Sequence, residues 1–323
     1  MRSIYSLLLR IAATGLLFSC NKDIKVEEPD FEVEVASATA RAGDSVIFTI
    51  TGNPDIISFY SGELGNSYEY IDKDRVLPTE SVNMSFQSQV RSQSGTSATY
   101  CQDHQFHVLV STDLNLAGAT MADSALSVQN ATWKEITDSF VICPLECSSA
   151  TPYYNSGIKD IKNLFVPGKP LRVAFKYINL PNPTNGRANI WRFSSFQMTA
   201  SNALGSGTLT SQADAGWTPV YIGTGWNLST AFGATSTVVT LRGLTTNLVN
   251  QEMWCISKPI ELTDANLGRE YAIGIKAYAD PPLKSYGHRF SKPGIYTVTF
   301  VATNTNVYDK KPVVRQIQMT IQP

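Results

Sequence analysis

The sequence predicts an all-β fold from three observations: its composition, its hydrophobic periodicity and the spacing of its turn residues. Of 323 residues only 16% are charged, 10% are aromatic, and Thr, Ser, Asn and Gly are abundant, which favours short strands over helices. After the N-terminal segment, no stretch of a dozen residues has helical periodicity. Strand-like segments recur at short spacing instead, a pattern typical of β-sandwiches rather than of parallel sheets with crossover helices.

The first twenty residues, MRSIYSLLLRIAATGLLFSC, predict an export signal. Arg2 and Arg10 flank an apolar run that is too short for a stable membrane span. The ending LFSC resembles a bacterial lipobox, which implies that Cys20 is lipidated and becomes the first residue of the mature protein. The alternative is a plain secretory peptide in which the cysteine occurs by chance.

Residues 21–30, NKDIKVEEPD, are charged and predict a flexible tether between a lipid and a folded domain. This Lys-Asp-rich stretch resembles the signal that sends lipoproteins of the Bacteroidetes to the outer face of the outer membrane. The resemblance implies a protein on the cell exterior that touches the membrane only through its lipid anchor. With 26 Lys and Arg against 27 Asp and Glu, the chain has no basic excess to neutralise a phosphate backbone, so nucleic acid is not an expected partner.

Fourteen segments are expected to form strands, because each is a short run of β-branched, aromatic or alternating residues bounded by turn residues. In chain order they are FEVEV (31–35), SVIFTIT (45–51), IISFY (56–60), VNMSFQSQV (82–90), QFHVLVST (105–112), ATWKEIT (131–137), LRVAFKYI (171–178), IWRFSSFQMT (190–199), PVYIG (219–223), TVVTLRG (237–243), EMWCISKPI (252–260), YAIGIKAY (271–278), IYTVTFVATN (295–304) and RQIQMTI (315–321). Several alternate apolar with polar residues and therefore predict strands with one face in water.

The two ends of the chain are expected to form one domain. About three strands lie between Asp30 and Tyr60 and two more follow Arg289, and neither group can bury a two-sided core alone. Joined, they have the strand count of a minimal immunoglobulin-like sandwich. We therefore expect a discontinuous domain of residues 31–71 plus 288–323, with a second domain of residues 72–287 inserted where the chain ends lie close together.

Several motifs resemble known families. AGDSVIFTITG (42–52) and PGIYTVTFVATN (293–304) resemble the early and late strands of polycystic-kidney-disease-type (PKD) domains. Motifs of the inserted region resemble galactose-binding-like jelly-roll sandwiches of the cleaved-adhesin and choice-of-anchor-J kind: FHVLVSTDLN (106–115), ATWKEITDSF (131–140), SGIKDI (156–161), KPLRVAFKY (169–177) and EMWCISKPIELTDAN (252–266). With ISFYSGELGNSY (57–68) in front, the mature chain resembles one Bacteroidetes lipoprotein family, domain of unknown function 5017. Met253 and Cys255 depart from that pattern.

Four cysteines remain after the lipobox, and in an exported protein they allow three fully paired connectivities. They are Cys101, Cys143, Cys147 and Cys255. The nearest pair, in ICPLEC, is able to close a small loop across its proline. A zinc site is disfavoured because no CxxC occurs and the only histidines are His104, His107 and His288. Buried free thiols or a single disulfide are expected.

One aromatic stretch is the candidate ligand-binding site. It is GWTPVYIGTGWNLSTAFGATS, and the candidate residues are Trp217, Tyr221, Thr224, Trp226, Asn227 and Phe232. Sugar rings stack on flat aromatic side chains while amides and hydroxyls bond to their hydroxyl groups. The alternative is that the two tryptophans of this stretch close the core of a sandwich. The remaining tryptophans, Trp133, Trp191 and Trp254, lie in strand patterns and are expected in the core.

Catalytic and metal motifs are scarce. The chain has no G-x-S-x-G, H-E-x-x-H, Walker or G-x-G-x-x-G motif, so no enzymatic activity is expected. Asp113, Asp138 and Asp160 lie beside turns and are weak candidates for the structural calcium that galactose-binding-like sandwiches often carry. The alternative for these three residues is an Asx turn or a solvated loop. No other cofactor is expected.

The resemblance implies a cell-surface lipoprotein that binds an oligosaccharide or polysaccharide without cleaving it, beside an outer-membrane importer of the SusC/SusD kind. An alternative of another class is an adhesin-like module that binds a protein partner on a host matrix or another cell. An exposed aromatic row in a concave site favours glycans, and a broad apolar patch favours a protein. A third hypothesis, a sugar hydrolase or lyase, requires two carboxylates within about 5 to 10 Å of each other in a cleft.

Overall fold

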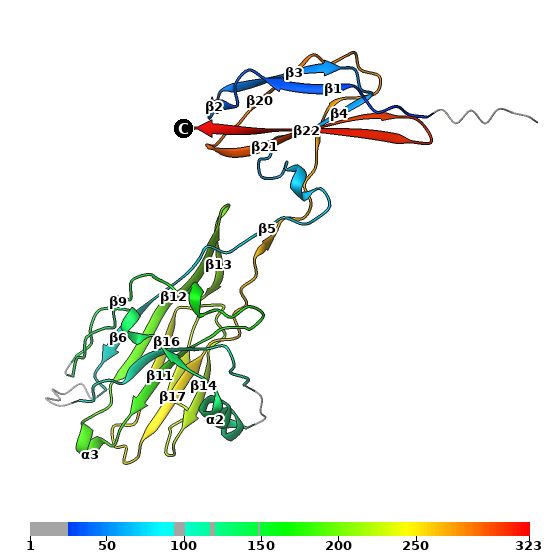
Figure 1. The fold of residues 1–323 in the computed structure, drawn as a ribbon. Helices are drawn as coiled ribbons and strands as arrows, with labels where there is room; N and C mark the ends of the chain where they lie inside the picture. Colours follow the sequence, from blue (N-terminus) through cyan, green and yellow to red (C-terminus); the bar gives the residue numbers. More distant parts are fainter. Residues whose placement is uncertain (1–24, 94–100, 117–119, 148) are drawn as a thin grey trace, which may run out of the picture. The chain divides into compact units, whose positions relative to one another are not determined.

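The computed structural model describes residues 25–93, 101–116, 120–147 and 149–323, and within them the chain is mostly β with several antiparallel sheets (Figure 1). The lipidation candidate Cys20 lies outside the described residues. The chain divides into two compact units. Unit 1 takes the residues up to Arg75 and again from Leu267 to Pro323, and unit 2 is Val76–Asn266. No helix in the described part of the chain is long and apolar enough to cross a membrane.

Unit 1 contains two sheets, each of which joins strands from both ends of the chain. The three-stranded sheet has the order β1 (Phe31–Val35), β3 (Ser45–Gly52), β20 (Ser285–Arg289). The five-stranded sheet has the order β19 (Ile273–Lys276), β4 (Ile56–Tyr60), β21 (Gly294–Thr305), β22 (Lys310–Gln322), β2 (Thr39–Arg41). All neighbours are antiparallel except β2 and β22, which are parallel.

One apolar core serves unit 1 and mixes the two chain ends. Phe48 of β3, Phe59 of β4 and Phe300 of β21 are fully buried, and their ring centroids lie 5.1 to 6.2 Å apart. Such contacts between aromatic rings add to the free energy of burying them. The segment IISFY, which has no partner strand nearby in the sequence, pairs with β21, about 240 residues later, through Ile57 and Ala302.

The expected boundaries of the inserted segment need correction. Residues 267–287 were assigned to the insert, but β19 pairs with β4 and β20 pairs with β3, so this segment belongs to unit 1. The physical reason is that β3 and β4 each have a second hydrogen-bonding edge, which these two strands occupy. At the first boundary, unit 1 continues to Arg75 rather than ending at residue 71.

Unit 2 contains two large sheets and a small one, all antiparallel. The seven-stranded sheet has the order β10 (Lys159–Asp160), β6 (Ser81–Arg91), β12 (Ile190–Asn202), β16 (Val238–Arg242), β15 (Phe232–Ala234), with β13 (Gly205–Ser211) on β12 and β9 (Tyr154–Asn155) on β6. The five-stranded sheet has the order β14 (Thr218–Ile222), β17 (Gln251–Ile256), β11 (Arg172–Asn179), β7 (Phe106–Ser111), β8 (Lys134–Glu135). Strands β5 (Val76–Leu77) and β18 (Ala265–Asn266) form the third.

The main core of unit 2 takes side chains from both large sheets. Phe193 of β12 and Phe175 of β11 stack with ring centroids 3.9 Å apart, and both are fully buried. The alternation in β6 is complete, because each residue that faces this core is followed by one that is partly exposed. Strand β6 therefore has one buried face and one face in water, as the sequence VNMSFQSQV predicts.

The other face of the five-stranded sheet is covered by helix α2 (Met121–Asn130), which lies beside β14 (Figure 1). Val128 of α2 is buried in a small cluster with Val220, Trp254 and other residues of that sheet. The sequence predicts no helix here, because ten residues are too few for a clear period. The short helices are α3 (Asn182–Asn185), η2 (Tyr68–Tyr70), η3 (Thr137–Ser139) and η4 (Lys162–Leu164).

Candidate functional site

The first residue of the predicted aromatic site, Trp217, is partly buried and packs against the core of unit 2. Its ring lies 5.0 Å from the rings of Phe193 and Phe196 and 5.4 Å from that of Phe175. The indole Nε1 is buried and has no hydrogen-bond partner in the described part of the chain. Trp217 therefore packs on the core, as in the alternative that the sequence left open, and remains partly exposed.

The other candidates of this stretch do not form an exposed aromatic row either. Tyr221 is 8% exposed, and burial raises the pKa of its hydroxyl. Trp226 packs on Tyr221 at 5.4 Å and donates Nε1–H to the carbonyl of Ile222, while Phe232 is half-buried against the same core. Only Thr224 and Asn227 are exposed, in the loop between β14 and β15.

The three calcium candidates do not come together. The Asp113 carboxylate accepts hydrogen bonds from Ser111 Oγ and the Thr132 N–H, and these lower its pKa. The Asp160 carboxylate accepts from the backbone N–H groups of Lys162 and Val82, which lower its pKa in the same way. Asp113 follows β7 and Asp160 lies in β10, so they belong to different sheets. Among the described residues, no group of three or more His, Cys, Asp or Glu could hold a metal ion.

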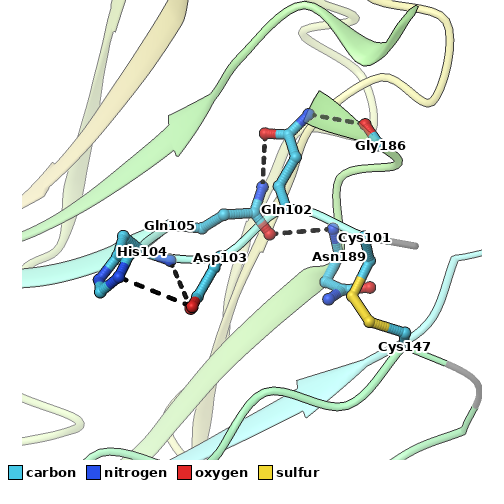
Figure 2. Close-up of a disulfide and its surroundings, with 8 residues drawn as sticks. All are labelled: Cys101, Gln102, Asp103, His104, Gln105, Cys147, Gly186 and Asn189. Carbon is cyan, nitrogen blue, oxygen red and sulfur yellow. Dashed lines mark hydrogen bonds and ion pairs between the residues drawn. A yellow bond between two sulfur atoms is a disulfide. The ribbon is translucent and has the colours of Figure 1, made fainter. Parts of the chain in front are cut away.

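The cysteines form one disulfide, between Cys101 and Cys147 (Figure 2). Cys143 and Cys255 are buried free thiols, so the short pairing of Cys143 with Cys147 that the sequence allowed is not made. Cys255 lies in β17 in the centre of the core, and burial raises the pKa of its thiol. Cys143 Sγ lies 2.9 Å from Thr151 Oγ1.

The chain next to the disulfide is anchored by two buried glutamines. Gln102 Nε2 donates to the carbonyl of Gly186, at 3.1 Å, and Gln105 Nε2 donates to Gln102 Oε1, at 3.3 Å (Figure 2). Gln105 Oε1 in turn accepts from the Asn189 N–H. Because buried amides need such partners, these bonds fix residues 102–105 against the connection between β11 and β12.

A pocket of about 320 Å³ lies beside this anchored segment. One wall is residues 103–106 and the other is residues 137–145. The disulfide links Cys101, just before the first wall, to Cys147, just after the second. Trp191 and Phe106 line it and stack on each other, with ring centroids 5.1 Å apart and planes at 11°. The full lining is Asp103, His104, Gln105, Phe106, Thr137, Asp138, Phe140, Ile142, Cys143, Pro144, Leu145 and Trp191.

Three exposed polar side chains line this pocket: Asp103, His104 and Asp138. His104 is exposed and has a φ of 50°, a left-handed conformation that turns the chain there, and its ring lies 3.6 Å from the Asp103 carboxylate. Asp138, one of the calcium candidates, is exposed and has no hydrogen-bond or ion-pair partner within the part of the chain that the structure describes. The pocket thus combines aromatic rings with two carboxylates and an imidazole, groups that accept or donate hydrogen bonds.

Sequence reasoning missed this pocket for an identifiable reason. Its two walls come from segments that are about 40 residues apart in the chain, and their proximity depends on the strand pairing of β7 and β8 and on the disulfide. Trp191 was assigned to the core, where it does lie, but it also lines the pocket. The only local signal is that Cys101 and Cys147 each lie within a few residues of a wall.

Comparison with known proteins finds one family. The model of the domain of unknown function DUF5017 matches residues 19–217, which is more than half of the chain. No curated protein and no solved structure matches. The chain therefore belongs to the DUF5017 family.

Proposed function

From this family membership as the premise, we propose that the chain is a surface lipoprotein that captures glycans without cleaving them, and that the pocket beside the disulfide holds the sugar. The observation that carries the proposal is the composition of the pocket: two stacked aromatic rings together with the exposed polar side chains of Asp103, His104 and Asp138. Sugars need both, because their C–H faces pack on flat rings and their hydroxyl groups form hydrogen bonds.

The volume of the pocket limits the length of glycan that it can hold. Its volume of about 320 Å³ is at the lower end of the range of about 300 to 1,000 Å³ for small-molecule sites. This favours the end of a glycan, or one short segment of it, over a long chain. Asp138 and His104 lie on opposite walls, and each is able to bond to a hydroxyl group of the same sugar.

The architecture proposed for this function is a PKD-like or immunoglobulin-like sandwich for unit 1 and a galactose-binding-like jelly roll for unit 2. In support, each unit has two larger sheets that contribute side chains to one core. Unit 1 would act as a spacer between the lipid anchor and unit 2. Cys20 would carry the lipid in the outer membrane, facing the exterior, and a SusC/SusD-type importer would receive the captured glycan.

The experiment is binding of the soluble protein, from Asn21 onward, to an array of host and dietary glycans. The pocket variant is His104→Gly/Asp138→Ala, in which glycine tolerates the left-handed backbone. The matched control is Thr224→Ala/Asn227→Ala, which changes two exposed polar residues of the loop first predicted to bind ligand. We expect a glycan that binds wild type and the control but is lost in the pocket variant.

Other outcomes contradict separate parts of the proposal. Loss of binding in the control variant alone would place the site in the loop between β14 and β15. Shortened glycan products after incubation would contradict capture without cleavage and would implicate the two pocket carboxylates, Asp103 and Asp138. No bound glycan, with a folded protein, would contradict glycan capture as a whole.

We keep the adhesin-like alternative as a second proposal because of one surface feature of unit 1. Val307 and Tyr308, in the turn between β21 and β22, are 92% and 88% exposed. Exposed apolar side chains at a loop tip suit contact with a protein. Substituting both with serine would weaken binding to a protein partner and leave glycan binding unchanged.

A further inference from the structure

The outward face of the seven-stranded sheet in unit 2 carries mostly polar side chains. In β6, the residues that face away from the core are partly exposed without exception. The neighbouring strands β12 and β16 continue this face, because residues directly opposite in an antiparallel pair point to the same side of the sheet. Three cross-strand rows follow from the register: Arg91, Ile190 and Arg242; Gln89, Arg192 and Thr240; Gln87, Ser194 and Val238.

Three arginines thus share one small area of this face. Neighbouring strands lie about 5 Å apart, so the Cα atoms of Arg91 and Arg242, with one strand between them, are about 10 Å apart. Arg192 lies on the intervening strand, two residues and about 7 Å along it from their row. Guanidinium groups on such long side chains can reach one common ligand from these three positions.

No carboxylate in the described part of the chain forms an ion pair with these three charges. Among the described residues, Arg91, Arg192 and Arg242 make no ion pair, and their side chains donate no hydrogen bond. The Nε atoms of Arg192 and Arg242 are buried without a partner. Two other arginines do form ion pairs, Arg75 with Glu270 at 2.9 Å and Arg315 with Glu32 at 2.8 Å.

The other side chains of the three rows are neutral. Gln87 Nε2 donates to Asn155 and Gln87 Oε1 accepts from Ser194, and Gln89 Nε2 donates to the Thr151 carbonyl, so these amides are held in place by the protein itself. None of the nine residues in these rows is acidic or aromatic. The area therefore repels cations and offers no ring on which a nucleic-acid base could stack.

We propose that Arg91, Arg192 and Arg242 form a second binding site, for a glycan that carries anionic groups such as uronate carboxylates or sulfate esters. The planar guanidinium group bonds to carboxylate and sulfate oxygens through two parallel N–H groups. The bound anions relieve the mutual repulsion of three unpaired cations. This inference rests on the proposed glycan capture for the class of ligand, but it uses a different surface from the pocket.

The test measures the affinity of the soluble protein, from Asn21 onward, for two anionic glycans, hyaluronan and heparin. The neutral controls are dextran and every neutral glycan that the array has shown to bind. A single-stranded DNA of similar charge is the control for binding of any polyanion. The variant is Arg91→Gln/Arg192→Gln/Arg242→Gln. The matched control is Arg41→Gln/Arg269→Gln/Arg289→Gln, which removes the same charge from exposed arginines of unit 1. Circular dichroism, which reports on the strands of both units, verifies that each variant is folded.

We expect wild type and the control to bind an anionic glycan, and the sheet variant to bind it at least tenfold more weakly, with binding that weakens as salt rises. Binding of hyaluronan identifies carboxylates as the ligand groups, and binding of heparin alone identifies sulfates. Equal losses in the two triple variants, no loss in the sheet variant, or equally tight binding of DNA would overturn the inference. If neutral glycans bind and anionic ones do not, this inference fails while the proposed function stands; if no glycan binds, both fail.

Discussion

Removing the disulfide should destabilise unit 2 by an amount that follows from its place in the chain. Cys101 and Cys147 are 46 residues apart. In the chain-entropy model, a cross-link that closes a loop of this length stabilises the folded state by about 4 kcal/mol. We expect Cys101→Ser/Cys147→Ser to lower the free energy of unfolding of unit 2 by that amount, and its Tm by roughly 8 to 16 °C for a unit of this size.

The five tryptophans make this measurement specific to unit 2. All of them lie within Val76–Asn266: Trp133, Trp191, Trp217, Trp226 and Trp254. Unfolding in denaturant followed by tryptophan fluorescence therefore reports on unit 2 and is blind to unit 1. A reducing agent should bring wild type close to the double variant and should leave the double variant unchanged, which controls for the serine substitutions themselves.

The double variant should also bind glycan more weakly while still folded, because the disulfide connects the two walls of the pocket. Two results would refute this reasoning. A loss of stability below about 1 kcal/mol would mean that the cross-link does not restrict the unfolded chain as its loop length implies. Unchanged glycan affinity in the folded variant would mean that the disulfide does not hold the pocket walls in place.

Three further predictions concern single side chains. Trp217→Ala should lower the free energy of unfolding of unit 2 by at most roughly 3 to 5 kcal/mol, since it removes a partly buried ring that packs on the core. Glycan affinity of the protein that remains folded should not change; chemical denaturation and the array check both. Tyr177→Phe should cost about 1 to 3 kcal/mol, because the buried Tyr177 hydroxyl donates to the Asn189 carbonyl and accepts from the Gly243 N–H; a loss below about 0.5 kcal/mol in the same denaturation would contradict it. The hydrogen bond to His107 lowers the pKa of Glu135 from its ordinary value of 4.5. The ionised carboxylate therefore stabilises the folded state above pH 4.5. This contribution to stability is lost as the pH falls through the lowered pKa. Glu135→Gln should therefore flatten the loss of stability below pH 4.5, measured as Tm against pH.

The all-β class was predictable because it depends on local features. The alternation in residues 82–90 identifies which side chains of β6 face the core, and the structure confirms that pattern. The association of the chain ends was also inferable, because two or three strands cannot bury a core alone. The local pattern did not predict that β19 and β20 lie at the edges of the two sheets of unit 1. An edge strand has a weak apolar pattern, and Ser285–Arg289 has no buried residue.

The aromatic stretch shows where composition misleads. Trp217 precedes β14 in a Gly- and Thr-rich segment with no alternation, which suggested exposed rings. Its burial comes from Phe175, Phe193 and Phe196, which lie more than 20 residues away and on two strands of different sheets. Helix α2 carried a better local signal, the capping box between Thr120 and Asp123, in which each residue bonds to the backbone of the other.

The two binding surfaces proposed for unit 2 differ in how much of each the sequence contains. The outward position of Arg192 follows from the alternation of IWRFSSFQMT, and that of Arg91 from VNMSFQSQVR, because side chains alternate along a strand. That these arginines meet Arg242 depends on the order of β6, β12 and β16 and on a register in which Arg91 and Arg242 both oppose Ile190. A shift of one residue in either pairing would turn the outward side chains of that strand toward the core. The register is held by the apolar side chains on the inner face, so the packing of the core determines which charges gather on the outer one.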